Sequence, residues 1–429
     1  MIKNCRTLQG TIDIGIKNGK IALLSGDLRE GCERVDAKNL FVMQGAIDAH
    51  VHFDDPGYTD REDFEHGSKS AIAGGVTCVI DMPCTSLPPV TTLEALKGKL
   101  SAIEGKAFCD FSLFGGIEGS DEDFLKHIRA LENYVAGFKC YDSSSMEGFK
   151  RISRGKMFEA LKASGRPILL HAEDNEIVEH FTHRYADSTD PLDWQRARPA
   201  IAEALSIRSA SFLAESAKGS LHTVHVSSRE GAMAVEEGKK RTSMTAETCP
   251  QYLLLNDEHL RSLGTIAKTS PPVRKREDNA FLWKSLRDGV MDFVASDHAP
   301  CKKEEKEKNF FEAYSGIPGV QTLLPLMISE GVNKKRINIE RAVEILSTAP
   351  AKRYGLYPGK GSLSIGADAD LVIIDLKKEW ILRNEGLFSK NALSPFDGRE
   401  MRGRVEKTFL RGELVYDGEP IIKKGRFMI

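Results

Sequence analysis

The chain has 429 residues, with 60 basic and 62 acidic side chains and a formal net charge of −2. This near balance, without a basic stripe, argues against a nucleic-acid partner and favours a small neutral or anionic substrate. No apolar run is long enough to span a membrane and the N-terminus lacks the apolar core of a signal peptide, so we expect a cytoplasmic protein. The eight cysteines form no CxxC pair, which favours reduced thiols over disulfides or a thiolate zinc site.

The two ends of the chain have the same β-rich texture. Near the start, the alternating segment Thr11–Ile16 is followed by Asn18-Gly19, a strong hairpin signal. From about Gly359 the sequence again consists of turns and short strands. We therefore predict that residues 1–44 and 359–429 pair into one small accessory β-domain.

Residues 45–358 alternate between strand-like and helix-like sequence. Eight apolar runs precede helical patterns or long loops: Ile47–Phe53, Val76–Met82, Ala107–Gly115, Val135–Tyr141, Pro167–Glu173, Leu221–Ser227, Thr242–Leu253 and Met291–Ala299. The helical patterns are Glu62–Ala73, Thr92–Ile103, Ser120–Leu131, Gly155–Ala163, Ile201–Ala217 and Asp278–Leu286. Eight such units in about 250 residues predict a (β/α)₈ barrel, an α/β fold, with a doubly wound open sheet as the alternative.

Ligand-type side chains stand at the ends of several of these runs. His50 and His52 are two residues apart, so the period of a strand puts both on one face. The others are Lys139, His171, His225 and Asp297. Alone, a histidine such as His171 could equally be a hydrogen-bonded core residue. In a barrel, however, the strand ends meet at one rim, so we expect the six side chains to converge.

Together these residues have the chemistry of a binuclear metal site. Lys139 is flanked by apolar residues, burial lowers a lysine pKa, and a neutral amine can react with carbon dioxide to give a carbamate. A carbamate could bridge two divalent ions, one held by the pair His50 and His52 and the other by the pair His171 and His225. Asp297 would complete the first site and carry a proton from water to the leaving nitrogen. This chemistry fits amide hydrolysis.

The motifs His50-Val51-His52, Gly137-Phe138-Lys139 and Ser296–Pro300 resemble the amidohydrolase superfamily, specifically its cyclic amidohydrolases: dihydroorotases, allantoinases and hydantoinases. The resemblance extends over essentially the whole chain, including Gly361–Asp375 in the β-domain. It implies a metal-dependent barrel with two divalent ions, zinc foremost, bridged by a carboxylated Lys139 and bound by the six positions, with Asp297 as acid and base. It also implies a homodimer or homotetramer that acts on a small cyclic amide.

The substrate-facing positions distinguish the members of this group. Dihydroorotases usually have an arginine, an asparagine and a histidine where this chain has Asp54, Cys84 and Cys301, and those residues serve the substrate carboxylate. At the first position, an arginine could bind the substrate carboxylate through two hydrogen bonds, whereas Asp54 carries the same charge as that carboxylate and would repel it. The segment Gly316–Gln321 looks more like an allantoinase, although Asp54 departs from that pattern too. We expect hydrolysis of allantoin to allantoate, with dihydroorotase and then hydantoinase as alternatives.

The remaining expectations concern the surroundings of the site. The substrate contacts that we expect are Asp54, Cys84, Ser270, Cys301, Gly316 and Gly319. The charged run Lys302–Lys308 is expected to be a solvated loop, with a lid over the site as the alternative. A metal-free scaffold protein, resembling the dihydropyrimidinase-related assembly proteins, is a remote alternative because such proteins tend to lose the ligand residues that this chain retains.

Overall fold

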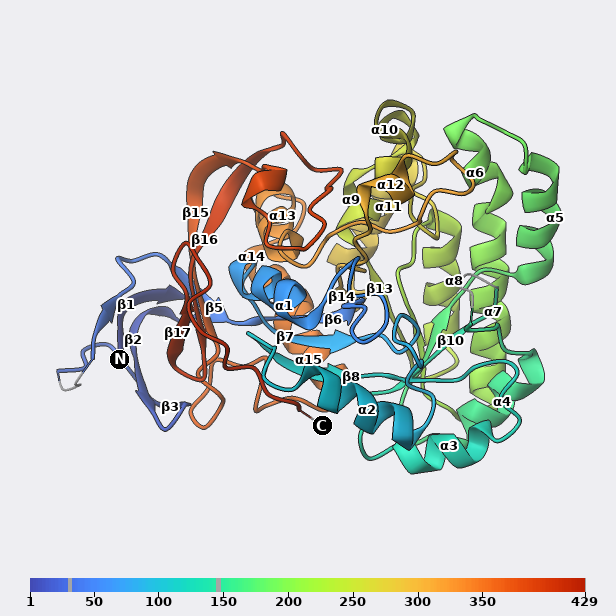
Figure 1. Cartoon of the computed structure of the whole chain (residues 1–429). Coiled ribbons are helices and arrows are strands. Elements are labelled where there is room, and N and C mark those ends of the chain that lie inside the picture. The colour runs from blue at the N-terminus through green and yellow to red at the C-terminus, as the bar shows by residue number, and fades with distance from the viewer. Residues whose placement is uncertain (30–32, 144–147, 429) are drawn as a thin grey trace.

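The computed structural model describes residues 1–29, 33–143 and 148–428 and shows a barrel beside a β-domain (Figure 1). The predicted pairing of the two chain ends is confirmed. The β-domain sheet has the order β17-β16-β15-β5-β1-β2-β3, with β4 paired to β1. Its strands are β1 (Ile2–Thr7), β2 (Gly10–Lys17), β3 (Lys20–Ser25), β4 (Val35–Asp36), β5 (Phe41–Gln44), β15 (Leu371–Ile381), β16 (Glu400–Leu410) and β17 (Glu413–Tyr416).

The two chain ends meet in this sheet where β5 pairs antiparallel with β15. Leu371 lies opposite Gln44 and Ile374 opposite Phe41. The predicted hairpin joins β2 to β3, and its turn residue Asn18 has a φ of 53°, as a tight primed turn requires. The limits of the two domains at residues 44 and 359 stay a prediction.

The barrel is built from parallel strands that share one direction. They are β6 (Ala46–Val51), β7 (Val76–Asp81), β8 (Asp110–Leu113), β9 (Gly115–Gly116), β10 (Phe138–Tyr141), β11 (Ile168–His171), β12 (Leu221–Thr223), β13 (Met244–Thr248) and β14 (Phe293–Val294). β8 and β9 follow one another with only Phe114 between them, so they form one barrel position. A bridge between Val51 and His298 closes the ring, which confirms the predicted barrel.

Helices surround the barrel in the order that the alternating sequence predicts. They are α1 (Phe64–Ala73), α2 (Leu93–Ile103), α3 (Phe124–Leu131), α4 (Arg154–Ala163), α5 (Asn175–Tyr185), α6 (Pro191–Ala197), α7 (Ala200–Ala217), α8 (Arg229–Lys239), α10 (Asp257–Leu263) and α11 (Arg276–Arg287). Side chains such as Asp63, Thr92 and Ser228 accept hydrogen bonds from the first backbone N–H groups and so define where helices begin. None of the helices in the described ranges is both long enough and apolar enough to cross a bilayer.

Shorter helical segments complete the chain. They are α9 (Pro250–Leu254), α12 (Lys303–Lys306), α13 (Leu323–Leu326), α14 (Ile339–Val343), α15 (Ala349–Arg353) and the tighter or wider turns η1 (Gly264–Ala267), η2 (Met327–Val332), η3 (Glu344–Thr348) and η4 (Asn384–Gly386). Several predicted runs are shorter as strands than expected, for example Leu221–Ser227, which is a strand only at Leu221–Thr223. The run Thr242–Leu253 turns into a helix at Pro250, a residue suited to a first helical position, and Met291–Ala299 is a strand only at Phe293 and Val294.

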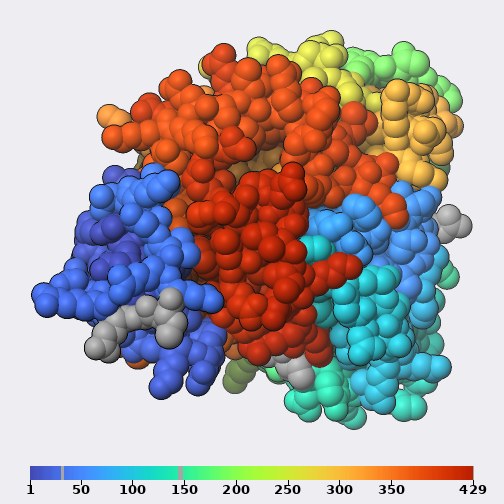
Figure 2. Space-filling model, turned by 60° about the vertical axis from the view of Figure 1, so that its left-hand side comes forward, coloured from blue at the N-terminus to red at the C-terminus, as the bar shows by residue number. Residues whose placement is uncertain are grey.

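A buried charge cluster joins the two domains. The Nζ of Lys360 lies 2.6 Å from carboxylate oxygens of Asp110 and Asp370 and 3.0 Å from Asp368. Asp110 belongs to barrel strand β8, whereas Lys360 and its other two partners precede β15. The C-terminal segment adds to this seam, since Gly425 donates to the carbonyl of Ala107, and Figure 2 shows this red segment on the surface between the blue N-terminal strands and the cyan barrel segment. The seven cysteines among the described residues are buried and unpaired, as expected.

Candidate metal and substrate site

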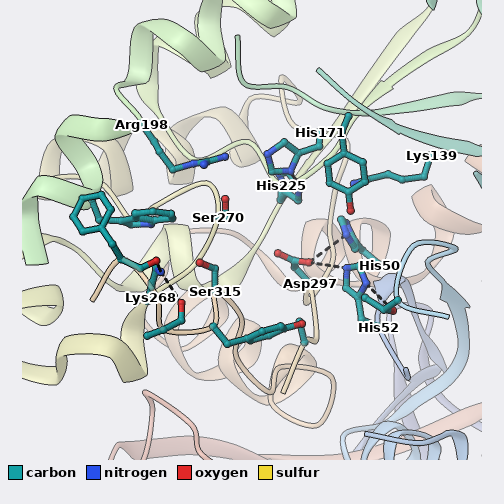
Figure 3. A pocket seen from close by; sticks show the side chains of 17 residues that line it. His50, His52, Lys139, His171, Arg198, His225, Lys268, Ser270, Asp297 and Ser315 are labelled. Carbon is teal, nitrogen blue, oxygen red and sulfur yellow. Dashed lines mark hydrogen bonds and ion pairs between the residues drawn. The ribbon is translucent and has the colours of Figure 1, made fainter. Parts of the chain in front are cut away.

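All six ligand-type residues line one cavity of about 370 Å³ at the C-terminal ends of the barrel strands (Figure 3). His50 lies in β6, Lys139 in β10 and His171 at the end of β11. His52, His225 and Asp297 follow β6, β12 and β14 by one, two and three residues. The barrel therefore brings these side chains together although 247 positions separate His50 from Asp297 (297 minus 50).

His50, His52 and Asp297 form the first group. The Nε2 atoms of His50 and His52 lie 3.2 Å and 3.4 Å from the same carboxylate oxygen of Asp297, and the dashed lines of Figure 3 mark these contacts. One possible ligand atom from each of the three residues lies within 4.8 Å of those of the other two. Two imidazoles and one carboxylate at this spacing are a suitable donor set for a divalent transition metal.

His171 and His225 form the second group. The Nδ1 of His171 faces the Nε2 of His225 at 3.0 Å, and the two rings lie edge to face with their centroids 4.7 Å apart. The His225 ring is also 5.3 Å from that of His50, so the two groups are neighbours. His225 has a φ of 41°, a left-handed conformation that turns its side chain into the cavity after strand β12 has ended.

The hydrogen bonds behind His50 and His171 direct the other nitrogen of each ring into the cavity. The Nδ1 of His50 lies 2.5 Å from Glu247, and the Nε2 of His171 lies 2.8 Å from Glu173. When a carboxylate accepts a hydrogen bond from one ring N–H, the opposite nitrogen is the one that carries a lone pair. The Nε2 of His50 is buried and, apart from its 3.2 Å contact with Asp297, has no partner in the described structure, as expected of a metal ligand. The residues present therefore fit divalent cations.

Lys139 is the buried amine of the site. Its side chain is 1% exposed, and burial lowers its pKa below the usual range of a lysine. Its Nζ lies 5.0 Å from the centre of the Tyr141 ring, and no carboxylate among the described residues forms an ion pair with it. A desolvated and unpaired lysine in a cavity of histidines has the properties that carbamate formation needs.

Asp297 combines burial with a low affinity for protons. Burial opposes its ionisation, but the hydrogen bond to His52 and the nearby charges of His225 and Lys139 lower its pKa to about 2. Its φ of 51° is a left-handed conformation that a non-glycine residue adopts at a cost of order 1 kcal/mol or more. The surrounding chain holds this conformation, because Ser296 N–H donates to Asp48 and His298 N–H donates to Ser296.

Sequence reasoning missed the residues that hold the site in shape. They are Glu247, Glu173, Arg198, Glu62 and His298. His298 is fully buried, lies 3.2 Å from Glu62 through Nε2 and accepts through Nδ1 from Gly319 N–H at 3.0 Å. One signal was available, because Glu173 follows His171 by two residues and so points to the same face of the strand.

The six predicted substrate contacts have different positions. Ser270 lies in the cavity wall, and Cys84 approaches the site with its Sγ 3.0 Å from the Tyr141 hydroxyl and 3.9 Å from the Nδ1 of His52. Asp54 is fully buried and is absent from the described wall residues, and burial raises its pKa to about 7. Both of its carboxylate oxygens lack a hydrogen-bond partner in the described structure.

The other three predicted contacts lie beside the wall. Cys301 is 3% exposed, and burial raises its pKa to about 11. Gly316 donates its N–H to the carbonyl of Lys268, and Gly319 donates to His298. These two backbone groups therefore hold the loop that borders the cavity, and their role as substrate contacts stays a prediction.

The side of the cavity opposite His50 and His52 is aromatic and is held by buried lysines. Its wall includes Trp194 and Phe311, whose rings lie edge to face with their centroids 5.5 Å apart. The Nζ of Lys268 lies 4.1 Å from the centre of the Trp194 ring and donates to the carbonyls of Phe311 and Ala313 at 3.0 and 2.6 Å. Figure 3 shows Arg198 and Lys268 on this side.

The charged run Lys302–Lys308 is only partly solvated. Lys303 and Glu304 are exposed, as expected, but Lys306 is 4% exposed and donates to the carbonyls of Tyr314 and Lys268 at 2.9 and 3.3 Å. Glu305 forms an ion pair with Arg61 at 2.6 Å. The expectation of a solvated loop is therefore wrong for Lys306, because the cavity wall supplies carbonyl partners that compensate its burial.

Comparison with known proteins adds to this geometry. Residues 41–415 match the model of the amidohydrolase family. The chain is 38% identical over 427 residues to the allantoinase of Rubrobacter xylanophilus, a match that covers 97% of this chain and 93% of the relative. It is 33% identical over 432 residues to the allantoinase of Escherichia coli strain K12, covering 97% and 95% of the two chains.

Solved structures give a second comparison. The L-hydantoinase (dihydropyrimidinase) of Arthrobacter aurescens superposes with a TM-score of 0.95 at 35% identity, over 99% of this chain and 98% of the other. The dihydropyrimidinase of Brevibacillus agri NCHU1002 has a TM-score of 0.93 at 27% identity, over 100% and 97% of the chains. The fold and the spatial arrangement of the barrel therefore match enzymes that these names describe as acting on cyclic amides.

Proposed function

The chain belongs to the amidohydrolase family as a hydrolase of cyclic amide C–N bonds, and from this premise we propose that it converts allantoin into allantoate. The observation that carries this proposal is the full-length similarity to proteins named allantoinase, at 33% to 38% identity. The alignments cover 96% or 97% of this chain, so they include the strand ends and the loops that form the cavity wall.

The six ligand-type residues would hold two divalent ions. His50, His52 and Asp297 suit one ion, and His171 with His225 suits the other, with a carboxylated Lys139 as the bridge between them. The two ions would activate a water molecule and polarise the carbonyl oxygen of the scissile amide. Zinc is the metal that we propose first, because imidazole and carboxylate ligands suit it, although they also suit other divalent transition metals.

Asp297 is the proposed proton carrier. With a pKa of about 2 its carboxylate is ionised at neutral pH and can accept the proton of the attacking water at an Oδ atom. The same oxygen can then return the proton to the nitrogen that leaves when the ring opens. The histidines that face this oxygen at 3.2 and 3.4 Å hold the carboxylate in the orientation that the transfer needs.

The cavity suits a flat, uncharged ring. Trp194 and Tyr314 supply aromatic faces against which a planar ureide can pack, and the hydroxyls of Ser270 and Ser315 supply hydrogen-bonding groups. Lys268, which also lies in the wall, is already engaged by two backbone carbonyls. Allantoin is neutral, so it needs no arginine at the position of Asp54.

Hydantoin hydrolysis is a second candidate, because the L-hydantoinase of Arthrobacter aurescens has a TM-score of 0.95 against this chain. The rings of hydantoin and allantoin are the same, and only the ureido arm distinguishes them. Dihydroorotate is the weaker alternative, because its carboxylate would lack the arginine discussed above.

A substrate panel tests the proposal. The kcat/KM of the zinc-loaded protein is measured for allantoin, hydantoin, dihydrouracil and dihydroorotate under the same conditions. We expect allantoin to have the highest value, by roughly tenfold or more over hydantoin, since the arm adds binding contacts. A higher kcat/KM for dihydroorotate than for allantoin would contradict the proposal.

A further inference from the structure

Two buried arginines lie beside only one of the two histidine pairs. Arg198 ends helix α6 and is 5% exposed, and Arg274 lies before α11 and is also 5% exposed. We propose that Arg198 and Arg274 are positioning residues that act through Glu173 and Ser227 on the pair His171 and His225, and so set the affinity of one metal ion without affecting the other. This inference rests on the binuclear centre proposed above.

The first contact runs from Arg198 to His171. The Nε of Arg198 lies 3.1 Å from both oxygens of Glu173, and its Nη2 donates to one of them. Such a two-point contact fixes the plane of a carboxylate as well as its position. The fixed oxygen accepts from the Nε2 of His171 at 2.8 Å, which holds the ring with its Nδ1 toward His225. Figure 3 shows Arg198 reaching toward His171.

The second contact runs from Arg274 to the chain that carries His225. The Nε of Arg274 lies 3.1 Å from the hydroxyl of Ser227, two residues after His225. Ser227 donates its N–H and its hydroxyl to Glu203, each at 2.8 Å. His225 itself has the left-handed φ of 41°, which persists only where the surrounding chain holds it. Arg274 and Glu203 are positioned to do this.

The two arginines are also joined to each other. The Nη1 of Arg274 donates to the backbone carbonyl of Arg198. A continuous series of contacts therefore runs from the ring of His171, through Glu173, Arg198 and Arg274, to the segment that carries His225. We call this series of contacts the arginine frame. Because both ligands of one proposed ion depend on it, a shift of either arginine should change the distance between the Nδ1 of His171 and the Nε2 of His225, now 3.0 Å.

The other histidine pair has different support. The Nδ1 of His50 lies 2.5 Å from Glu247, and the Nδ1 of His52 lies 3.3 Å from the hydroxyl of Thr85. Neither arginine of the frame contacts Glu247 or Thr85 among the hydrogen bonds and ion pairs of the described residues. Loss of the frame should therefore weaken one ion and spare the other.

The test measures ion content under competition. Wild-type protein, Arg198→Lys and Arg274→Lys are loaded with zinc and dialysed against buffers of graded free zinc, and bound zinc per chain is counted. Lysine keeps the charge of arginine but lacks its planar guanidinium group. If the arginines act through geometry, the lysine variants should therefore bind zinc more weakly. We expect one ion to dissociate at a free zinc concentration about 10 to 100 times higher than in wild type, and the other at an unchanged concentration.

Two further variants make the result specific. Arg154→Lys is the matched control, because Arg154 pairs with Asp174 at 2.8 Å with half of its side chain exposed, and we expect wild-type binding of both ions. His171→Ala identifies the ion concerned. In that background Arg198→Lys should have no further effect on the remaining ion, since the ligand through which it acts is absent.

Three outcomes would overturn the inference: unchanged affinity for both ions, equal weakening of both, or a raised KM for allantoin with both ions retained, which would mean that Arg198 contacts substrate instead. Circular dichroism checks folding, and Ser227→Ala and the near-isosteric Glu173→Gln carry the same expectation if a lysine variant does not fold. Wild-type protein that binds fewer than two zinc ions contradicts the proposed centre itself, whereas wild-type protein with two ions and insensitive variants contradicts the arginine frame alone.

Discussion

The proposed metal end of the cavity, which the six ligand-type residues line, and the opposite wall are built in different ways. The first consists of side chains at barrel strand ends, and two of them, His50 and His171, are held from behind by the buried carboxylates of Glu247 and Glu173. The opposite wall consists of Trp194 in helix α6 and of loop residues such as Phe311, and the buried Lys268 contacts the Trp194 ring and donates to the carbonyl of Phe311. We therefore expect the strand ends to carry the reaction chemistry and the opposite wall to influence the choice of substrate.

The largest expected effect is at the metal end. Lys139→Ala removes the proposed bridge between the ions, and we expect kcat/KM for allantoin to fall by about 10³-fold or more, as for loss of a group that acts on the reacting atoms. Addition of a small carboxylate such as acetate should restore part of the activity, because it can occupy the bridging position. Full activity of Lys139→Ala without additive would contradict the bridge.

A smaller effect is expected one layer behind the metal end. Glu247→Gln keeps the size of the side chain but weakens the acceptor of the His50 ring proton, and we expect zinc affinity to fall about 10 to 100-fold. The ion affected should be the one at His50, in contrast to the ion affected by Arg198→Lys. The dialysis assay with zinc measures this, and loss of the other ion would contradict the assignment of Glu247 to the His50 side.

The wall should respond in KM more than in kcat. Trp194→Ala removes an aromatic face of the cavity, and we expect KM for allantoin to rise by roughly tenfold with kcat changed by less than about threefold. Trp194→Phe keeps an aromatic ring and serves as the matched control, with a smaller rise in KM. A fall in kcat with unchanged KM would place Trp194 with the reaction chemistry and break the comparison.

The smallest expected effect is on stability. Burial lowers the pKa of Lys268 from 10.5 to about 7. Between these values the unfolded chain binds a proton at this lysine that the folded chain does not, so stability rises with pH by at most about 1.4 kcal/mol per pH unit. The contribution is constant below about pH 7.

Chemical unfolding at pH 7, 8 and 9 measures this dependence as the difference between wild-type protein and Lys268→Met. We expect the free energy of unfolding to rise less steeply with pH in Lys268→Met than in wild type. Parallel slopes in the two proteins would show that Lys268 is not titrating across this range.

The metal end could be predicted from the sequence because its signals are local. His50 and His52 have the spacing of one strand face, and each of the other ligand-type residues lies two positions before the end of its apolar run. The predicted barrel implies that these residues lie close together, since the strand ends of a closed parallel sheet meet at one rim. The accessory β-domain followed in the same way from the matching texture of the two chain ends.

Apart from Glu173, which is close to His171 in sequence, the supporting residues could not be predicted because their partners are distant in sequence. Glu247 is 197 positions from the His50 ring that it supports, and nothing in the run Thr242–Leu253 marks it as a hydrogen-bond acceptor in the barrel interior. Lys306 lies in a charged run that resembles a solvated surface, and only the carbonyls of Tyr314 and Lys268 make its burial possible.

Removal and return of metal tests the account most directly. The protein is stripped of metal with a chelator, and its hydrolysis of allantoin is measured as zinc is returned in known ratios. The account predicts no activity without metal and a rise to full activity as bound zinc approaches two ions per chain. Full activity of the stripped protein, or a plateau at one ion per chain, would contradict the two-ion centre on which the account depends.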